Sequence, residues 1–125
     1  FVRYTTAAQV RALRPDMPAL AALADSGTFG VGATAPGTDG DADVDFVSRF
    51  FAPAKGIAED PVTGSAHCTL APLWKARLGR SLDGGQRYRA RQVGSRSGEL
   101  ECESDERRVV MYGNAVTVLR GELEL

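Results

Sequence analysis

The sequence lacks three features that would assign a chain to a specialised class of protein. It has only two cysteines, which are too few for a disulfide framework. It contains no apolar run approaching the roughly 20 residues needed to span a bilayer, and no signal peptide is visible. Its net charge of -1 gives no reason to expect nucleic acid or a membrane surface as a partner.

The composition instead predicts an ordinary globular domain. Of the 125 residues, 43% are hydrophobic and 25% are charged, which is typical of a soluble protein with one core. We therefore expect residues 1–125 to form a single cytoplasmic domain. Because the chain starts at Phe1 and not at methionine, we also expect it to be trimmed or to be a fragment.

The first part of the chain predicts two short helical pieces and two strands. Thr6 can cap a first helix, and a second piece with Pro15 in its first turn ends before Gly27. Residues 28–35 are rich in β-branched and small side chains, which favours a strand. A second strand begins near Val44 and leads into the central segment.

Four aspartates alternate through the turn region between these strands: Asp39, Asp41, Asp43 and Asp45. Such a row could offer oxygen ligands to calcium, yet no glutamate stands at the closing position of a calcium loop. We therefore interpret the row as a solvated turn and predict no metal site.

An apolar stripe with helical spacing then predicts a buried helix over residues 64–78. The stripe consists of Ala66, Leu70, Leu73, Trp74 and Leu78. Gly79 is a plausible C-cap, and Pro72 should bend the helix because it removes one backbone N–H. Cys68, inside this helix, is expected to pack as a small hydrophobe.

The start of this helix is a candidate anion site. The first N–H groups of a helix have no partner within it, and the peptide dipoles add to a partial positive charge there. Gly64 lets a carboxylate or phosphate approach the backbone, and the hydroxyls of Thr63 and Ser65 can add hydrogen bonds. The alternative is an ordinary loop in which Asp60 and Thr63 only cap a core helix.

Beyond the helix, alternating charges predict a hairpin that closes near Ser95. One register places Arg87, Arg89 and Arg91 opposite Glu103, Glu101 and Glu99 on the solvent side. The same register turns Tyr88, Ala90, Leu100 and Cys102 toward the core. We therefore expect surface ion pairs and not a basic binding patch. Further strands are predicted over residues 108–112 and 115–120.

The central segment also resembles a known family. The matching pieces are Ser48-Arg49-Phe50-Phe51-Ala52-Pro53, Gly56-Ile57 and Glu59-Asp60-Pro61-Val62-Thr63-Gly64-Ser65-Ala66-His67. This long motif is similar to that of the phenazine-biosynthesis PhzF-like family, whose members are isomerases and epimerases with the diaminopimelate epimerase fold. Weaker resemblance extends over the rest of the chain and includes the turn over residues 92–98.

The resemblance implies an α+β fold, in which a curved, mostly antiparallel sheet wraps around one central helix. Family members contain two such halves, and this chain matches the C-terminal half. The N-terminal half, which carries the glutamate used as acid or base, has no counterpart here. The resemblance also implies that no metal or organic cofactor is used and that homodimers are common.

The resemblance further assigns roles to single residues. Asp60 would hydrogen-bond or polarise a small carboxylate-bearing substrate, Ser65 would orient it, and the amides of Gly64 and Ser65 would hold its anionic group. His67 is a candidate for substrate contact, with a packed core histidine as the alternative. Arg96 is another candidate, with an exposed turn arginine as the alternative.

Glu59 is not expected to replace the missing glutamate, because adjacent residues of an extended segment point to opposite sides. Two hypotheses follow. The chain is half of an isomerase that is active only with its N-terminal partner, or it is a non-catalytic module for small-anion binding or dimerisation. A hydrolase built on Ser65, His67 and Asp60 is disfavoured, since no Gly-x-Ser-x-Gly elbow is present.

Overall fold

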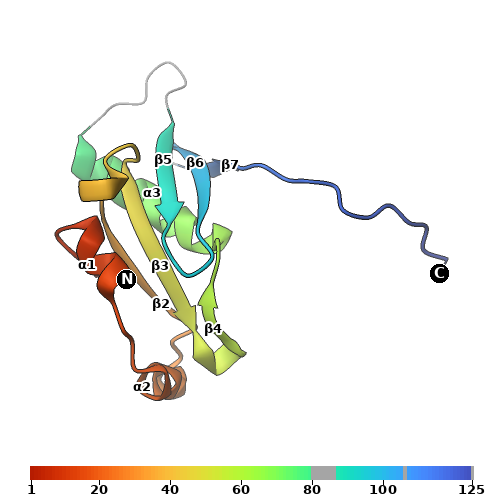
Figure 1. Ribbon diagram of the computed structural model, residues 1–125, viewed down its shortest axis with the longest axis horizontal. Helices are drawn as coiled ribbons and strands as arrows, with labels where there is room; N and C mark the ends of the chain where they lie inside the picture. Colours follow the sequence, from red (N-terminus) through yellow and green to blue (C-terminus); the bar gives the residue numbers. More distant parts are fainter. Residues whose placement is uncertain (80–86, 106, 125) are drawn as a thin grey trace.

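The computed structural model describes residues 1–79, 87–105 and 107–124, and in these ranges the strands form one mixed sheet of seven strands (Figure 1). The strands are β1 (Val2–Arg3), β2 (Val31–Pro36), β3 (Phe46–Ala52), β4 (Ile57–Asp60), β5 (Tyr88–Gln92), β6 (Gly98–Ser104) and β7 (Val109–Tyr112). The α-helices are α1 (Ala7–Ala12), α2 (Met17–Ala22) and α3 (Gly64–Leu78). Short 3₁₀ turns lie at Leu23–Ser26, Asp39–Asp41 and Pro53–Lys55.

The sheet order is β1-β2-β3-β5-β6-β7, and β4 pairs with β3 off this path. The β1–β2 and β3–β5 pairs are parallel, whereas the remaining pairs are antiparallel. The predicted α+β class is therefore confirmed. Strand β4 was not anticipated by the sequence, which indicated only an extended loop before α3.

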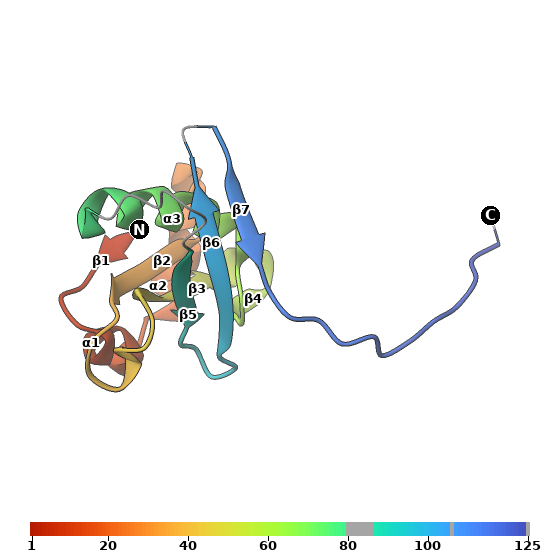
Figure 2. The same cartoon turned by 90° about the horizontal axis from the view of Figure 1, so that it is seen from above.

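Helices cover both faces of the sheet, because α1 packs on the face opposite the long predicted helix α3 (Figure 2). On one face, α3 packs Leu70 and Trp74 against Phe46. On the other face, α1 packs Val10 against Val47. The reason lies in β3, whose side chains are buried along its whole length, so that both faces of this strand need cover.

The two short helices follow ordinary capping chemistry. Thr6 forms the predicted cap, since its hydroxyl accepts a hydrogen bond from the Gln9 backbone N–H in a capping box. The second helix starts later than predicted, because Asp16 and not the segment at Pro15 provides its N-cap. Gly27 ends this region in the left-handed conformation with φ of 81°.

Helix α3 has the predicted bounds and ends at Gly79, whose φ is 63°. It continues through Pro72 to Leu78, so the proline does not terminate it. Cys68 is exposed, which corrects the expectation that it packs as a hydrophobe. It lies off the buried stripe, which also includes His67 and Ala71.

The β5–β6 hairpin has the predicted register, with Arg91 opposite Glu99 and Arg89 opposite Glu101. The ion pairs follow this register only in part. Arg91 contacts Glu99 at 2.6 Å, while Arg87 bridges Glu101 and Glu103 at 3.0 Å each. Arg89 turns away from the hairpin, and its guanidinium donates to the backbone carbonyl of Asp43.

The aspartate row is only partly the solvated turn that the sequence predicted. Asp41 is 1% exposed and is held between Arg11 at 2.6 Å and Arg91 at 2.9 Å. A buried carboxylate needs such partners, because an unpaired charge is costly to remove from water. Asp43 also contacts Arg91, at 2.7 Å. Among the described residues, no group of three or more potential metal ligands was found.

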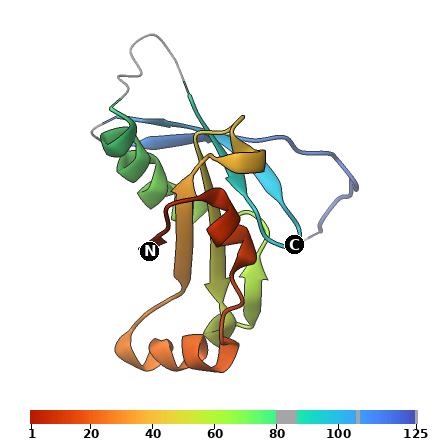
Figure 3. The same ribbon diagram turned by 60° about the vertical axis from the view of Figure 1, so that its left-hand side comes forward.

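The strand predicted over residues 115–120 does not form. Residues 113–124 leave the body of the protein as an extended segment without strand pairing (Figure 3). Its apolar side chains are almost fully exposed, at 85% for Val116, 92% for Val118 and 84% for Leu119. A strand needs a partner, and this segment meets none within the described chain. Among the helices described here, none is long and apolar enough to span a membrane.

Candidate functional site

The N-terminus of α3 lies beside the end of β4, which places Thr63 next to Asp60. The Thr63 hydroxyl donates to the Asp60 carboxylate over 2.5 Å. Its side chain makes no capping hydrogen bond to α3, although threonine at this position commonly accepts a backbone N–H. The backbone N–H groups of Gly64 and Ser65 have no acceptor among the described residues.

Gln92 joins this site from the end of β5. Its side chain is fully buried. Its carbonyl oxygen accepts the Thr63 backbone N–H over 2.9 Å, and its amide nitrogen donates to the Asp60 backbone carbonyl and to the Thr63 hydroxyl. The amide thus fixes the loop between β4 and α3 from the strand behind it.

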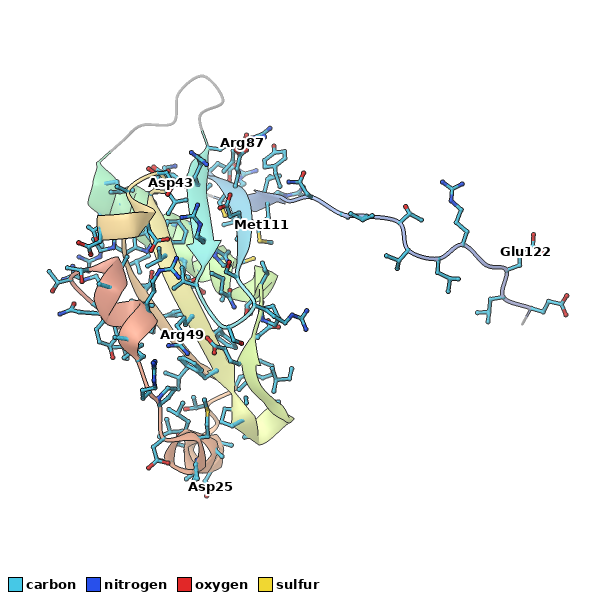
Figure 4. The ribbon with its side chains drawn as sticks, viewed as in Figure 1. Asp25, Asp43, Arg49, Arg87, Met111 and Glu122 are labelled. Carbon is cyan, nitrogen blue, oxygen red and sulfur yellow. The ribbon has the colours of Figure 1, made fainter. Side chains whose placement is uncertain are left out.

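Glu59 and Asp60 are separated as predicted. Glu59 binds Arg49 through both carboxylate oxygens, at 2.6 and 3.0 Å. Arg49, labelled in Figure 4, also donates to backbone carbonyls at the end of α1, including that of Leu13 at 2.9 Å. Glu59 is therefore engaged in a structural ion pair, whereas Asp60 is bonded to the loop that starts α3.

A cavity of about 360 Å³ lies between β4 and the turn that joins β5 to β6. Asp60, Gly94 and Arg96 contribute to its wall. Arg96 makes no hydrogen bond or ion pair with any residue that the structure describes, so its guanidinium is open to an anionic ligand. Gly64 and Ser65 do not line this cavity. A ligand that contacts both the Arg96 guanidinium and the Gly64 and Ser65 amides must extend from the cavity to the helix terminus.

His67 lies in the core, as its packed alternative predicted. Its ring is fully buried and stacks on Phe46, with ring centroids 5.9 Å apart. Its Nδ1 lies 2.7 Å from the Thr63 carbonyl oxygen, which can only accept, so Nδ1 carries the proton. Nε2 has no partner among the described residues, and burial lowers the pKa of this histidine.

Ser65 is exposed while His67 is buried, and no hydrogen bond between them is found in the described chain. The disfavoured hydrolase therefore lacks its nucleophile and base pair. The buried hydroxyl of Ser48 also has no hydrogen-bond partner among the described residues.

Met111, from β7, borders the helix terminus (Figure 4). A side-chain carbon built onto Gly64 would lie 3.7 Å from the Met111 methyl group, which is ordinary contact. The open N–H groups thus have a flexible apolar neighbour. A ligand bound there has a polar side at the backbone and an apolar side at Met111.

A second cavity, of about 280 Å³, lies over β5, β6 and β7. Its wall includes Arg87 and Glu101, which pair with one another at 3.0 Å. Since such pairs neutralise the charges there, this cavity is less suited to a charged ligand than the cavity at Asp60.

Comparison with known proteins relates the chain to one family. Residues 1–121 match the family described as phenazine biosynthesis-like protein, PhzC-PhzF. The chain belongs to this family. It is 49% identical over 117 residues to an uncharacterized isomerase of Pseudomonas aeruginosa, and the match covers 93% of this chain and 40% of that protein. A phenazine biosynthesis-like domain-containing protein of Homo sapiens is 45% identical over 80 residues, 63% of this chain and 26% of that protein.

Solved structures show the same relation. A crystal structure of a phenazine biosynthesis protein of the PhzF family from Enterococcus faecalis has a TM-score of 0.78 and 40% identity. The match covers 98% of this chain and 43% of that one. The PhzF-like chain described here thus spans less than half the length of these relatives and corresponds to their C-terminal half.

The sequence analysis missed two residues of the site. Gln92 entered only as part of a family turn, although it continues the core-facing alternation of Tyr88 and Ala90. A polar residue in such a position needs buried partners, and that is the signal that could have found it. Met111 gave no signal, because its place beside Gly64 depends on how β7 pairs with β6.

Proposed function

We propose that this chain supplies the anion-binding half of a proton-transfer site in a cofactor-independent isomerase. The observation that carries the proposal is the start of α3, where the N–H groups of Gly64 and Ser65 have no acceptor among the described residues and Thr63 bonds to the neighbouring Asp60. Such a terminus favours a carboxylate, because the groups point outward and the helix dipole is positive there.

In this mechanism, the substrate is a small carbon acid with a carboxylate. The Gly64 and Ser65 amides, the Ser65 hydroxyl and Arg96 hold and orient its anionic groups, while Asp60 accepts a hydrogen bond from it. A carboxylate from the complementary half removes a proton from carbon, and the electron pair of the broken C–H bond delocalises into the adjacent π system. Return of the proton to another carbon gives the isomer.

The complementary half is a required partner in this proposal. Proton transfer from carbon needs a carboxyl group held in a cleft shielded from water, and this chain provides one wall of such a cleft. We further propose a diaminopimelate epimerase-like arrangement of the two halves, homodimer formation and a cytoplasmic location. The free thiols of Cys68 and Cys102 suit a reducing compartment.

A hybrid protein tests this function. Residues 1–121 would replace the matching segment of the Pseudomonas aeruginosa isomerase, which is 49% identical to this chain. The hybrid would be incubated in D₂O with a metabolite extract, and mass spectrometry would follow deuterium entering carbon-bound positions. We expect labelling that an Asp60→Asn hybrid loses. A folded hybrid that labels nothing, beside a parent isomerase that labels its substrate, would contradict the proposal.

The alternative is a module that binds small anions or dimerises without catalysis. The observation in its favour is the extended segment over residues 113–124, whose exposed Val116 and Val118 offer an association surface. Sedimentation of the chain alone separates the two functions. A concentration-dependent dimer that still binds carboxylates, together with an inactive hybrid, would favour the module.

A further inference from the structure

The hydrogen bonds around Asp60 form a series in which each donor points toward Asp60. It starts at Gln92, whose amide orientation is fixed by two backbone groups. The Thr63 N–H can only donate, so the atom facing it at 2.9 Å is the Gln92 oxygen. The Asp60 carbonyl can only accept, so the amide nitrogen faces it.

The second proton of that nitrogen continues the chain to Thr63. The Gln92 nitrogen lies 3.1 Å from the Thr63 hydroxyl oxygen and donates to it. A hydroxyl has a single proton, which is then directed at the Asp60 Oδ2 atom over 2.5 Å. Oδ2 is therefore occupied as an acceptor, while Oδ1 has no partner among the described residues.

The arrangement is not what helix stability alone would favour. Thr63 is the N-cap residue of α3, where a threonine hydroxyl ordinarily accepts a backbone N–H of the first turn. Here the hydroxyl instead donates to Asp60. His67 reinforces this geometry, since its Nδ1 donates to the Thr63 carbonyl over 2.7 Å.

We propose that Gln92 and Thr63 are positioning residues that assign the two oxygens of Asp60 to different tasks. Oδ2 is held by the Thr63 hydroxyl, and Oδ1 is presented to the ligand in the cavity that Asp60 lines. The amides of Gly64 and Ser65, which have no acceptor among the described residues, lie at the same loop and bind the carboxylate.

The effect on proton transfer rests on the proposed function, whereas the orientation of the Asp60 carboxylate does not. The first test is therefore structural and uses the chain as it is. In crystal structures, Thr63→Val should release the Asp60 carboxylate from its present orientation, because the shape is kept but the donor is lost. Thr63→Ser should preserve the orientation. An unchanged Asp60 side chain in the valine variant would overturn the proposal.

The second test uses the hybrid isomerase and its deuterium labelling. We expect Thr63→Val to slow labelling roughly 10- to 100-fold, the range that loss of one oriented group commonly costs. Thr63→Ser should stay within about threefold, since it restores the donor. Equal losses in both folded variants would contradict a positioning role.

Gln92→Glu provides an independent variant, because it removes the donor at one end of the chain and keeps the size of the side chain. In crystals, the Thr63 hydroxyl should then turn toward the new carboxylate and leave Asp60. A hydroxyl that stays on Asp60 would count against the relay. If the unsubstituted hybrid labels nothing, the proposed function fails, and the crystal structures still decide the geometry.

Discussion

The polar side chains on the two faces of the sheet differ in their partners. On the face covered by α1, arginines neutralise carboxylates, as Arg49 does for the partly buried Glu59 and Arg11 for the buried Asp41. On the face covered by α3, the buried Gln92 amide bonds to backbone and hydroxyl groups, and the His67 Nε2 atom has no partner among the described residues. Charges that are fully paired stabilise the fold, whereas constrained groups with open atoms suit ligand binding.

Glu59 and Asp60 show this contrast within one dipeptide. They are neighbours in β4 and both line the cavity beside the β5–β6 turn, but Glu59 turns to Arg49 and Asp60 turns to Thr63. Both Glu59 oxygens bind one guanidinium, and only one Asp60 oxygen has a partner in the described chain. The position in the strand, and not the residue type, decides which carboxylate can bind a ligand.

The largest effect is expected from breaking the paired face. Arg49→Met leaves the Glu59 carboxylate, whose side chain is 15% exposed, without its cation and removes the donor to the Leu13 carbonyl. Loss of one partner of a fully buried pair costs about 3–5 kcal/mol, which is the upper bound for this partly buried pair. Urea unfolding followed by circular dichroism measures this change. Arg3→Met, at an exposed position, is the matched control and should change stability by less than about 0.5 kcal/mol.

The open face should respond in binding and not in stability. Gly64→Ala fills the approach to the helix terminus, and the added carbon would lie 3.7 Å from Met111 without a clash. We expect an unchanged or slightly higher melting temperature, with carboxylate affinity reduced about tenfold. Benzoate titration followed by NMR provides the affinity. Gly40→Ala, which has open space around it, should leave affinity unchanged.

The buried histidine gives the open face a pH dependence. Burial lowers the pKa of His67 below its ordinary value of 6.5. Below pH 6.5 the unfolded chain therefore binds a proton that the folded chain does not bind. The free energy of unfolding is at its full value above pH 6.5 and falls as the pH drops below it. One group limits the slope to about 1.4 kcal/mol per pH unit.

His67→Asn is expected to flatten this slope, since asparagine can keep a donor near the Thr63 carbonyl without titrating there. Thermal melts of both proteins between pH 5 and pH 8, roughly the range in which histidine titrates, compare the two slopes. Parallel curves would show that His67 does not set the pH dependence.

The smallest effect is expected at the exposed end of the paired face. The Glu99 side chain is 55% exposed, and its contact with Arg91 lies in water. Glu99→Gln should cost no more than about 1 kcal/mol, and the cost should shrink in high salt. Unfolding at low and high sodium chloride tests this. A loss as large as that of Arg49→Met would remove the distinction between buried and surface pairs.

Local patterns predicted much of the fold. The apolar stripe from Ala66 to Leu78 predicted α3, and the alternating charges from Arg87 to Glu103 predicted the hairpin register. Both predictions are confirmed, because each pattern lies within a short stretch of sequence. The burial of Asp41 was not foreseen, since its partners Arg11 and Arg91 are distant in sequence. The strand expected over residues 115–120 failed because a strand also requires a partner.

The candidate site was predictable to a similar depth. The family motif and the helix terminus indicated Asp60, Gly64 and Ser65, and the cavity places Arg96 in one wall with Asp60. The orientation of the Thr63 hydroxyl and the role of Gln92 were not predictable. Both depend on the distance between β5 and the start of α3, which no local pattern specifies.

The central claim is that the start of α3 binds a small carboxylate beside Asp60. The most direct measurement is a titration of the isotope-labelled chain with benzoate, followed through its backbone amide resonances. We predict saturable shifts at Gly64 and Ser65, with millimolar affinity expected for so small a ligand, on the order of 1–10 mM. Shifts confined to the arginines of β5, or no saturable shift at all, would contradict the claim.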